Sequence, residues 1–366
     1  MTYHKFIQTF FSITCVSLLF AGLSHTAWAE DKAPATTLNP NPEGSAVILL
    51  YHRFGEDKLP STSIRLEQFD AQLDYLADNH FHVWSLSKLV AALKNHTPIP
   101  EKTVVLTVDD AWKSVYTAAY PRMKARDWPM TVFVNTDPVD KGYHSNMTWS
   151  QMREMQKHAI EFANHSKSHD FMIQSAKETE ADWRQRITQD LAQAQKRLQT
   201  ELNPNTNQAK LVSYPYGEFS ASLAKLLKQL GYTALAQNSG AVGYGANQRA
   251  LMRFPMNETY GKLDSFQLKV NAKFFPIKDY EPFDPVAKDN PPRLVLHFSS
   301  PQKNIQCFNH KGEKLLTHWR TPLTLQVVDQ NPLKPPRDRY ACTQPTSDGY
   351  WRWFSHSWII LEQPHS

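Results

Sequence analysis

The sequence lacks a dense run of basic residues, a long apolar stretch beyond its first segment, and any internal repeat. Lysine and arginine number 40 against 35 acidic residues, a formal charge of +5 that is spread along the chain. This weak balance argues against nucleic acid as a partner. Hydrophobic residues make up 41% of the chain and charged residues 20%, so we expect a globular protein. Its 366 residues suffice for one large domain and a small one.

The first segment has the features of an export signal. Lys5 supplies positive charge, residues 6–23 are largely apolar, and Ala27-Trp28-Ala29 offers a small-x-small cleavage site. We therefore predict a signal peptide over residues 1–29 and a periplasmic or secreted protein with no membrane span after cleavage. An uncleaved membrane anchor is the alternative.

Two cysteines remain after this cleavage. Cys15 would be removed with the apolar run, where attachment of a lipid is a less favoured alternative. Cys307 and Cys342 stay in the mature chain, and an exported protein with two cysteines favours a disulfide between them. In the chain-entropy model this bond would stabilise the C-terminal part by roughly 3 to 4 kcal/mol.

Composition divides the rest of the chain. Residues 30–44 are rich in Pro, Asn, Thr and Ala and are predicted to be a linker. Residues 45–278 form the main domain, and residues 279–292, rich in proline and acids, are predicted to be a second linker. Residues 293–366 contain short β-like runs and predict a small all-β module.

Short apolar runs alternate with helix-spaced segments in the main domain. The run Thr103–Val108 is mostly Val and Leu and is too short for a typical helix. Trp183, Ile187 and Leu191 follow the spacing of an amphipathic helix. Strands that alternate with helices indicate a parallel sheet, and therefore an α/β fold.

Two short motifs carry the chemistry. Asp109 and Asp110 end the buried run, and adjacent carboxylates there are costly unless positive charge lies beside them. His165 and His169 lie in a second motif, after an apolar segment. One carboxylate and two imidazoles suit a borderline divalent metal with open positions for water and substrate. The other aspartate would then be free to move protons.

Together with residues 213–217 (Ser-Tyr-Pro-Tyr-Gly), these motifs resemble the polysaccharide deacetylases, the family-4 carbohydrate esterases with a NodB-like domain. The resemblance covers roughly residues 45 to 260. It implies a distorted, incomplete (β/α) barrel of the polysaccharide deacetylase type, followed here by the small all-β module. The polar residues at strand ends agree with this fold, because parallel barrels place their sites there.

The resemblance also implies roles for these residues. Asp110, His165 and His169 would bind one divalent metal, namely zinc, with cobalt or nickel as alternatives. Asp109 would be the general base that takes a proton from water.

The Ser-Tyr-Pro-Tyr-Gly motif would bind the substrate through Tyr214, Pro215 and Tyr216. By family analogy, the Tyr216 N–H would stabilise the oxyanion. The alternative for Tyr214, which we favour, is loop packing.

Three positions depart from the family pattern. Ala111 replaces the usual Gly after the aspartates, and Ser213 lies where many members have an Arg that orients the base, so we expect Asp109 to be less constrained. The late Leu-x-His motif, which carries the general acid, has no clear match in the main domain; residues 295–297 only look similar. His52, at the end of the first strand, is our candidate replacement, with a purely structural polar residue as the alternative.

The predicted function is metal-dependent hydrolysis of N-acetyl groups on an N-acetylhexosamine polysaccharide, with release of acetate. The Tyr51-His52 strand resembles the exopolysaccharide poly-N-acetylglucosamine deacetylases more than the chitin enzymes. The alternatives are a glycan-binding or assembly protein with a degenerate site, and a small-amide hydrolase. Trp351, Trp353 and Trp358 could form a glycan platform or the core of the β module. No protein partner and no role for the family-like segment Arg253-Phe254-Pro255 are predicted.

Overall fold

The computed structural model describes residues 41–202 and 210–360, which fall within a single compact unit. The predicted signal peptide and most of the predicted linker over residues 30–44 lie outside the described residues. Within the described ranges, no helix combines the length and the apolar composition needed to cross a membrane.

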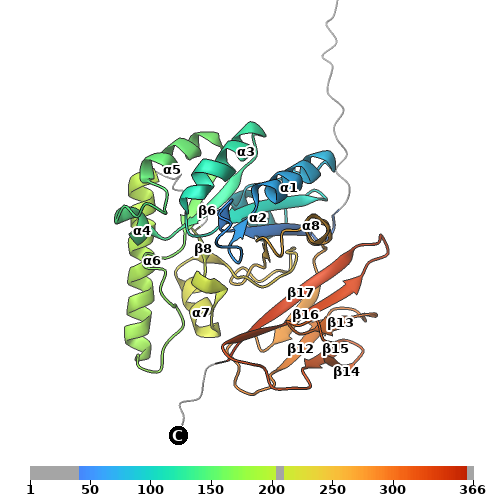
Figure 1. The fold of residues 1–366 in the computed structure, drawn as a ribbon. Helices are drawn as coiled ribbons and strands as arrows, with labels where there is room; N and C mark the ends of the chain where they lie inside the picture. Colours follow the sequence, from blue (N-terminus) through green and yellow to red (C-terminus); the bar gives the residue numbers. More distant parts are fainter. Residues whose placement is uncertain (1–40, 203–209, 361–366) are drawn as a thin grey trace, which may run out of the picture. The chain divides into compact units, whose positions relative to one another are not determined.

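A parallel sheet of eight strands forms the main domain, in the order β10-β1-β5-β6-β7-β8-β9, with β4 added on β5 (Figure 1). The sheet curls into an incomplete barrel, so the predicted fold class is confirmed. The strands are β1 (Ala46–Tyr51), β4 (His82–Val83), β5 (Thr103–Val108), β6 (Met130–Val134), β7 (Ile160–Asn164), β8 (Lys210–Ser213), β9 (Tyr232–Leu235) and β10 (Phe254–Pro255). A separate pair of short strands comprises β2 (Arg53–Phe54) and β3 (Ser63–Ile64).

Helices connect these strands. They are α1 (Leu66–Asp78), α2 (Leu86–Asn95), α3 (Tyr120–Ala125), α4 (Thr136–Asp140), α5 (Trp149–Met155), α6 (Glu180–Leu202), α7 (Ala221–Gln229) and α8 (Leu263–Val270), with short turns at Val115–Ala119, Gln156–His158 and Pro215–Gly217. Thr148 caps the N-terminus of α5, because its hydroxyl accepts from the Gln151 N–H. A π-helical turn at Val115–Ala119 leads directly into α3, which begins next to Pro121.

Alternate residues of the central strands face two different cores. Val47 and Leu49 of β1 pack in one hydrophobic cluster, while Ala46 and Ile48 pack in another. Both faces of the strand are therefore buried, which explains its continuous apolar sequence. Because the strands are parallel, the residues that follow β1, β5, β7 and β8 all meet at one edge of the sheet.

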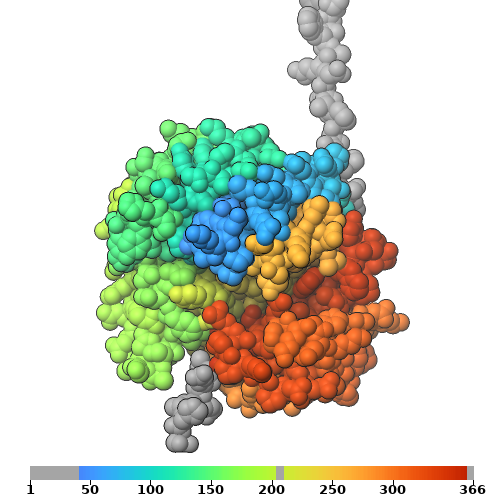
Figure 2. Space-filling model, in the orientation of Figure 1, coloured from blue at the N-terminus to red at the C-terminus, as the bar shows by residue number. Residues whose placement is uncertain are grey.

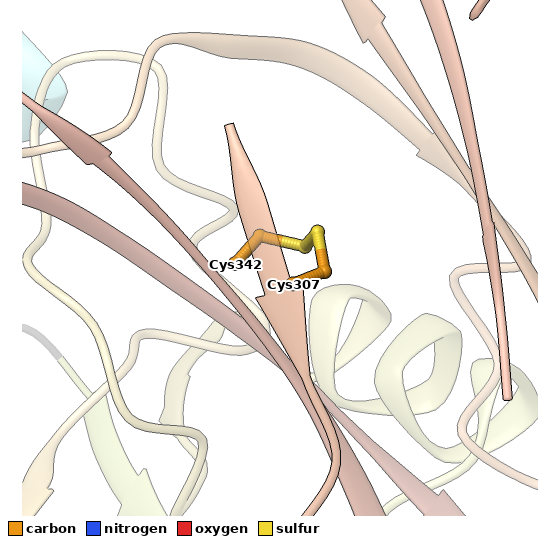
Figure 3. The surroundings of a disulfide bond; sticks show 2 residues. All are labelled: Cys307 and Cys342. Carbon is orange, nitrogen blue, oxygen red and sulfur yellow. A yellow bond between two sulfur atoms is a disulfide. The ribbon is translucent and has the colours of Figure 1, made fainter. Parts of the chain in front are cut away.

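The C-terminal module consists of two antiparallel sheets, in the orders β11-β12-β15-β14 and β13-β16-β17. Its strands are β11 (Ile277–Glu281), β12 (Arg293–Phe298), β13 (Gln306–Phe308), β14 (Leu316–Thr321), β15 (Thr324–Val328), β16 (Arg337–Pro345) and β17 (Trp351–Ile359). Cys307 of β13 and Cys342 of β16 lie directly opposite each other and form a disulfide (Figure 3). Strand β11 overlaps the segment expected to be a linker from residue 279, because its pairing with β12 outweighs the proline-rich composition that follows.

The module is bonded to the main domain. Ser355 Oγ donates to the Ser239 carbonyl oxygen at 2.7 Å, and the Arg352 guanidinium donates to both carboxylate oxygens of Glu43 at 2.6 and 2.8 Å. One hydrophobic cluster also contains residues from both parts, among them Leu251 and Trp358. The two parts therefore share a core and form one structural unit.

Candidate active site

Three side chains that can ligate a metal converge at the carboxyl-terminal edge of the parallel sheet. Asp110 lies just beyond β5, His165 follows β7, and His169 lies further along the same loop. Asp110 Oδ1 lies 3.2 Å from Nε2 of His165 and 3.2 Å from Nε2 of His169. The ligand atoms of the three residues all lie within 4.8 Å of one another. The structure thus brings together the three residues predicted to bind a metal.

Hydrogen bonds orient two of these side chains as a metal ligand requires. Nδ1–H of the buried His165 donates to the Ser213 carbonyl oxygen at 2.9 Å, so Nε2 keeps its lone pair. Trp112 Nε1–H donates to Asp110 Oδ2 at 3.0 Å, which leaves Oδ1 buried and without a hydrogen-bond partner among the described residues. Such an oxygen is costly unless a cation neutralises it. This donor set fits a borderline divalent metal such as zinc, cobalt or nickel.

The loop that carries His169 is shaped by local polar side chains. Asn164 Oδ1 accepts from the Ser166 N–H at 2.8 Å, and Ser166 Oγ accepts from the His169 N–H at 2.9 Å. Asp190 of α6 accepts from the Lys167 N–H at 2.7 Å. Ser166 and His169 have φ angles of 64° and 61°, in the left-handed region that these bonds support.

The charges of the site attract a cation. Burial alone would raise the pKa of Asp110, but the imidazoles of His165 and His169 hold it well below its usual value. Burial would likewise lower the pKa of His165, yet Asp109 and Asp110 raise it above the ordinary value. Positive charge between these groups is therefore stabilised, whether protons on the imidazoles or a metal supply it.

Asp109 is buried and held by a different part of the chain. Arg253 Nη1 donates to Oδ1 at 2.8 Å and Nη2 donates to Oδ2 at 2.9 Å, a bidentate pair. Ser213 Oγ donates to Oδ2 at 2.9 Å. Burial acts to raise the pKa of Asp109, but Arg253 keeps it below its usual value. Asp109 is thus an oriented carboxylate, and the expectation that Ser213 leaves it less constrained is wrong, because Arg253 supplies the constraint.

The backbone turns sharply where the family usually has a glycine. Asp110 and Ala111 have φ angles of 75° and 52°, which cost roughly 1–3 kcal/mol at a residue other than glycine. The turn is held by Asn146, whose Nδ2 donates to the Asp110 carbonyl oxygen at 3.1 Å, and by Met147, whose N–H donates to the Ala111 carbonyl oxygen at 2.9 Å. These bonds offset the conformational cost of having Ala111 where the family usually has a glycine.

His52 lies beside the two aspartates. Tyr51 and Val108 are paired across β1 and β5, so the residues that follow them, His52 and Asp109, are neighbours at the edge of the sheet. Burial lowers the pKa of His52 even though the charges of Asp109 and Asp110 oppose this. The structure therefore places His52 in the candidate site, and its role as the acid stays a prediction.

Residues 96–235 match the family model described as polysaccharide deacetylase. The chain carries a polysaccharide deacetylase domain. The predicted resemblance to this family is thus confirmed.

Two curated relatives and one solved structure illustrate the likeness. The chain is 26% identical over 241 residues to the poly-beta-1,6-N-acetyl-D-glucosamine N-deacetylase of Escherichia coli (strain K12), covering 56% of this chain and 35% of that protein. It is 25% identical over 258 residues to the protein of the same name from Staphylococcus aureus (strain MSSA476), covering 63% of this chain and 84% of that protein. A Streptococcus pyogenes deacetylase, PplD, solved with acetate, has a TM-score of 0.55 and 24% identity over 62% of this chain and 98% of that one. The chain thus spans about a third of the length of the Escherichia coli relative.

The Ser-Tyr-Pro-Tyr-Gly loop of the deacetylase domain is only partly available to a substrate. Tyr214 is fully buried, stacks on Phe219 with ring centres 5.2 Å apart, and donates its hydroxyl to the Arg249 carbonyl oxygen at 2.9 Å. Pro215 is also buried. Packing fills the surroundings of both side chains, and their role in substrate binding stays a prediction. Tyr216 is 45% exposed, and its ring centre lies 4.8 Å from that of His169.

Sequence reasoning missed two residues of the deacetylase domain's site. Arg253, in the family-like segment left without a role, orients Asp109. Trp112 orients Asp110, and its ring lies 3.3 Å from the Arg53 guanidinium, which stacks on it. Two features of the sequence could have indicated these residues. They are the family-like segment Arg253-Phe254-Pro255 and the position of Trp112 two residues after Asp110.

The three tryptophans of the β module have different surroundings. Trp358 is fully buried and lies in the shared core, which fits the structural alternative. Trp353 is partly buried against Phe254, with ring centres 5.3 Å apart. Trp351 is 38% exposed and remains available to a ligand.

Proposed function

We propose that the deacetylase domain hydrolyses N-acetyl groups of a poly-β-1,6-N-acetylglucosamine-type polysaccharide and releases acetate. The observation that carries this proposal is the division of labour between two adjacent aspartates. Asp110 Oδ1 lies 3.2 Å from Nε2 of both His165 and His169, while Asp109 is held by Arg253 with its Oδ2 3.9 Å from Nε2 of His165. A metal-ligand set beside a separate oriented carboxylate is the arrangement that amide hydrolysis by activated water requires. The names of the relatives indicate the polysaccharide.

A divalent metal held by Asp110, His165 and His169 would polarise the amide carbonyl and lower the pKa of the attacking water. Asp109 accepts the proton that water loses as it attacks the carbonyl carbon. Its bidentate pair with Arg253 keeps it ionised and aimed at that proton.

The leaving amine requires a proton when the carbon–nitrogen bond breaks. His52, at the end of β1 and next to Asp109, is the group that we propose to donate it. Burial lowers the pKa of His52, and the charges of Asp109 and Asp110 oppose this and favour the protonated form that the step requires. The backbone N–H of Tyr216, beside His169, would donate to the oxyanion. The products are acetate and a free amine on the sugar.

The site of action is proposed to be outside the cytoplasm, periplasmic or extracellular. The predicted signal peptide supports this, and the Cys307–Cys342 disulfide is compatible with an oxidising compartment.

Acetate release by the purified full chain tests the proposal. The substrates are poly-β-1,6-N-acetylglucosamine and a β-1,4-linked N-acetylglucosamine oligomer, each assayed as purified, after chelation, and after zinc is added back. We expect release from the β-1,6 polymer that chelation abolishes and zinc restores. Absence of release from both glycans by metal-loaded protein would overturn the proposed activity, and preference for the β-1,4 oligomer would overturn the proposed substrate.

A further inference from the structure

Two cavities meet between the deacetylase domain and the β module. The larger, about 590 Å³, is lined by α8 and by strands β13, β16 and β17, and the smaller, about 300 Å³, begins at Tyr216. Both are lined by Tyr260, His310 and Arg339. Figure 2 shows the surface hollowed where α8 meets the red strands of the module. Because these residues line both, the two cavities adjoin, and we call them together the module groove.

One end of the module groove lies at the candidate active site. Tyr216 lines the smaller cavity, and its ring packs edge-on against that of His169. The other end is at Trp351, the first residue of β17. A polymer that places an acetyl group at His169 can therefore continue along the groove toward the module.

Exposed aromatic side chains are spaced along this path. Tyr216 is 45% exposed, Tyr260 42% and Trp351 38%. Flat aromatic faces suit the apolar C–H faces of sugar rings, and rigid aromatic side chains bind at low cost in conformational entropy. Exposed aromatics that gather in one groove indicate a binding site rather than chance exposure.

Hydrogen bonds hold the backbone of two of these residues in place. Lys273 N–H donates to the Trp351 carbonyl oxygen at 2.8 Å, which fixes the start of β17 against the deacetylase domain. The Tyr260 N–H donates to Asn257 Oδ1 at 2.8 Å, and Lys269 Nζ donates to the Tyr260 carbonyl oxygen at 2.7 Å. The groove is therefore pre-formed, which reduces the cost of ordering it on binding.

The charge of the larger cavity selects among glycans. Glu218 and Asp338 line the smaller cavity, beside Arg337 and Arg339. Lys269, Lys311 and Arg339 line the larger one, and no carboxylate does so among the described residues. A deacetylated stretch, which carries protonated amines, would be repelled there. An N-acetylated stretch carries no charge and would not be.

We propose that the module groove binds an N-acetylated segment of the polysaccharide that extends from the active site, so that the β module gives the enzyme a preference for long, still-acetylated chains. This inference rests on the proposed function, which supplies the identity of the polymer. A protein partner on the same surface is the competing occupant.

The test compares Trp351→Ala and Tyr260→Ala with a matched control, Trp319→Ala. Trp319 lies on β14 in the other sheet of the module, is 39% exposed, and lines neither cavity. Two readouts are used for each full-length protein: kcat and KM for acetate release from N-acetylated β-1,6-glucosamine disaccharide and longer oligomers, and binding of the same oligomers to chelator-treated protein by calorimetry.

We expect both groove variants to raise KM for long oligomers about ten-fold and to weaken the binding of these oligomers similarly. The kcat for long oligomers and the KM for the disaccharide should not change. Trp319→Ala should change nothing, and fully deacetylated oligomers should bind the unmodified chain at least about ten-fold more weakly than acetylated ones. The groove would be overturned if KM rose equally for the disaccharide and the long oligomers. It would also be overturned if KM and binding of the long oligomers changed by less than about two-fold, a result that would favour a protein partner.

The two proposals can fail separately. If the chain binds long acetylated oligomers through Trp351 but releases no acetate, the proposed function fails and the groove stands. If it releases acetate equally well from every length in all variants, the groove fails and the proposed function stands.

Discussion

Replacing Arg253 with alanine should strongly destabilise the protein, because it would leave the Asp109 carboxylate buried without its partner. Both side chains of this ion pair are 0% exposed. Arg253 also donates from Nε to the Ala236 carbonyl oxygen at 3.0 Å and from Nη2 to Ser213 Oγ at 2.7 Å. Breaking one partner of a buried pair typically costs about 3–5 kcal/mol. Since domains are stable by about 5–15 kcal/mol, this is a large share of the total.

Arg122→Ala is the matched control. Arg122 also makes a bidentate pair, with Asp70 at 2.6 and 3.0 Å, but the two side chains are 26% and 42% exposed. Solvent screens such a pair, so its loss should cost only about 0–1 kcal/mol. Denaturant unfolding followed by fluorescence measures both variants against the unmodified chain.

Two further variants separate charge from geometry. Arg253→Lys keeps the charge but not the planar two-pronged donor, so we expect a smaller loss of stability and a kcat reduced by about 10²-fold through misplacement of Asp109. Asp109→Leu combined with Arg253→Met removes both charges and should recover most of the stability without activity. If Arg253→Ala costs no more than Arg122→Ala, the buried pair does not have the energetic role that we assign to it.

Three other predictions concern the metal site, the disulfide and the groove. Asp109→Asn should keep the metal and lose about 10²–10⁴-fold in turnover, whereas Asp110→Asn should lose the metal. Metal analysis and acetate assays on both variants measure this, and the reverse pattern would exchange the two roles. Thiol titration of denatured, unreduced protein should find Cys307 and Cys342 unreactive, and two free thiols would refute the bond. Replacing both cysteines should lower the free energy of unfolding by about 4 kcal/mol, given their sequence separation of 35. Burial lowers the pKa of Lys269 from 10.5 to about 8. Its protonation therefore opposes folding below pH 8, and this penalty disappears as the pH rises toward 10.5. Allowing about 1 kcal/mol for the lost bond to Tyr260, Lys269→Met should raise the free energy of unfolding by about 2 kcal/mol at pH 7 and lower it by about 1 kcal/mol above pH 10.5. An equal effect at both pH values would contradict this.

The sequence alone determined the parts of the fold that depend on local pattern. Apolar runs such as Thr103–Val108 became strands, and the stripe of α6 from Trp183 to Leu198 is buried as its spacing predicted. The metal-ligand candidates could also be named, because Asp110 and the two histidines lie in short motifs whose residue types suit a cation.

The tertiary structure decided what depends on contacts between distant segments. Arg253 meets Asp109 across 144 positions, and no local pattern announces such a pair. Tyr214 and Tyr216 look equivalent in sequence, yet packing against Phe219 buries the first and a left-handed turn exposes the second. Side-chain orientation and burial are set by the whole core, which is why the groove at the β module became visible only once the chain was folded.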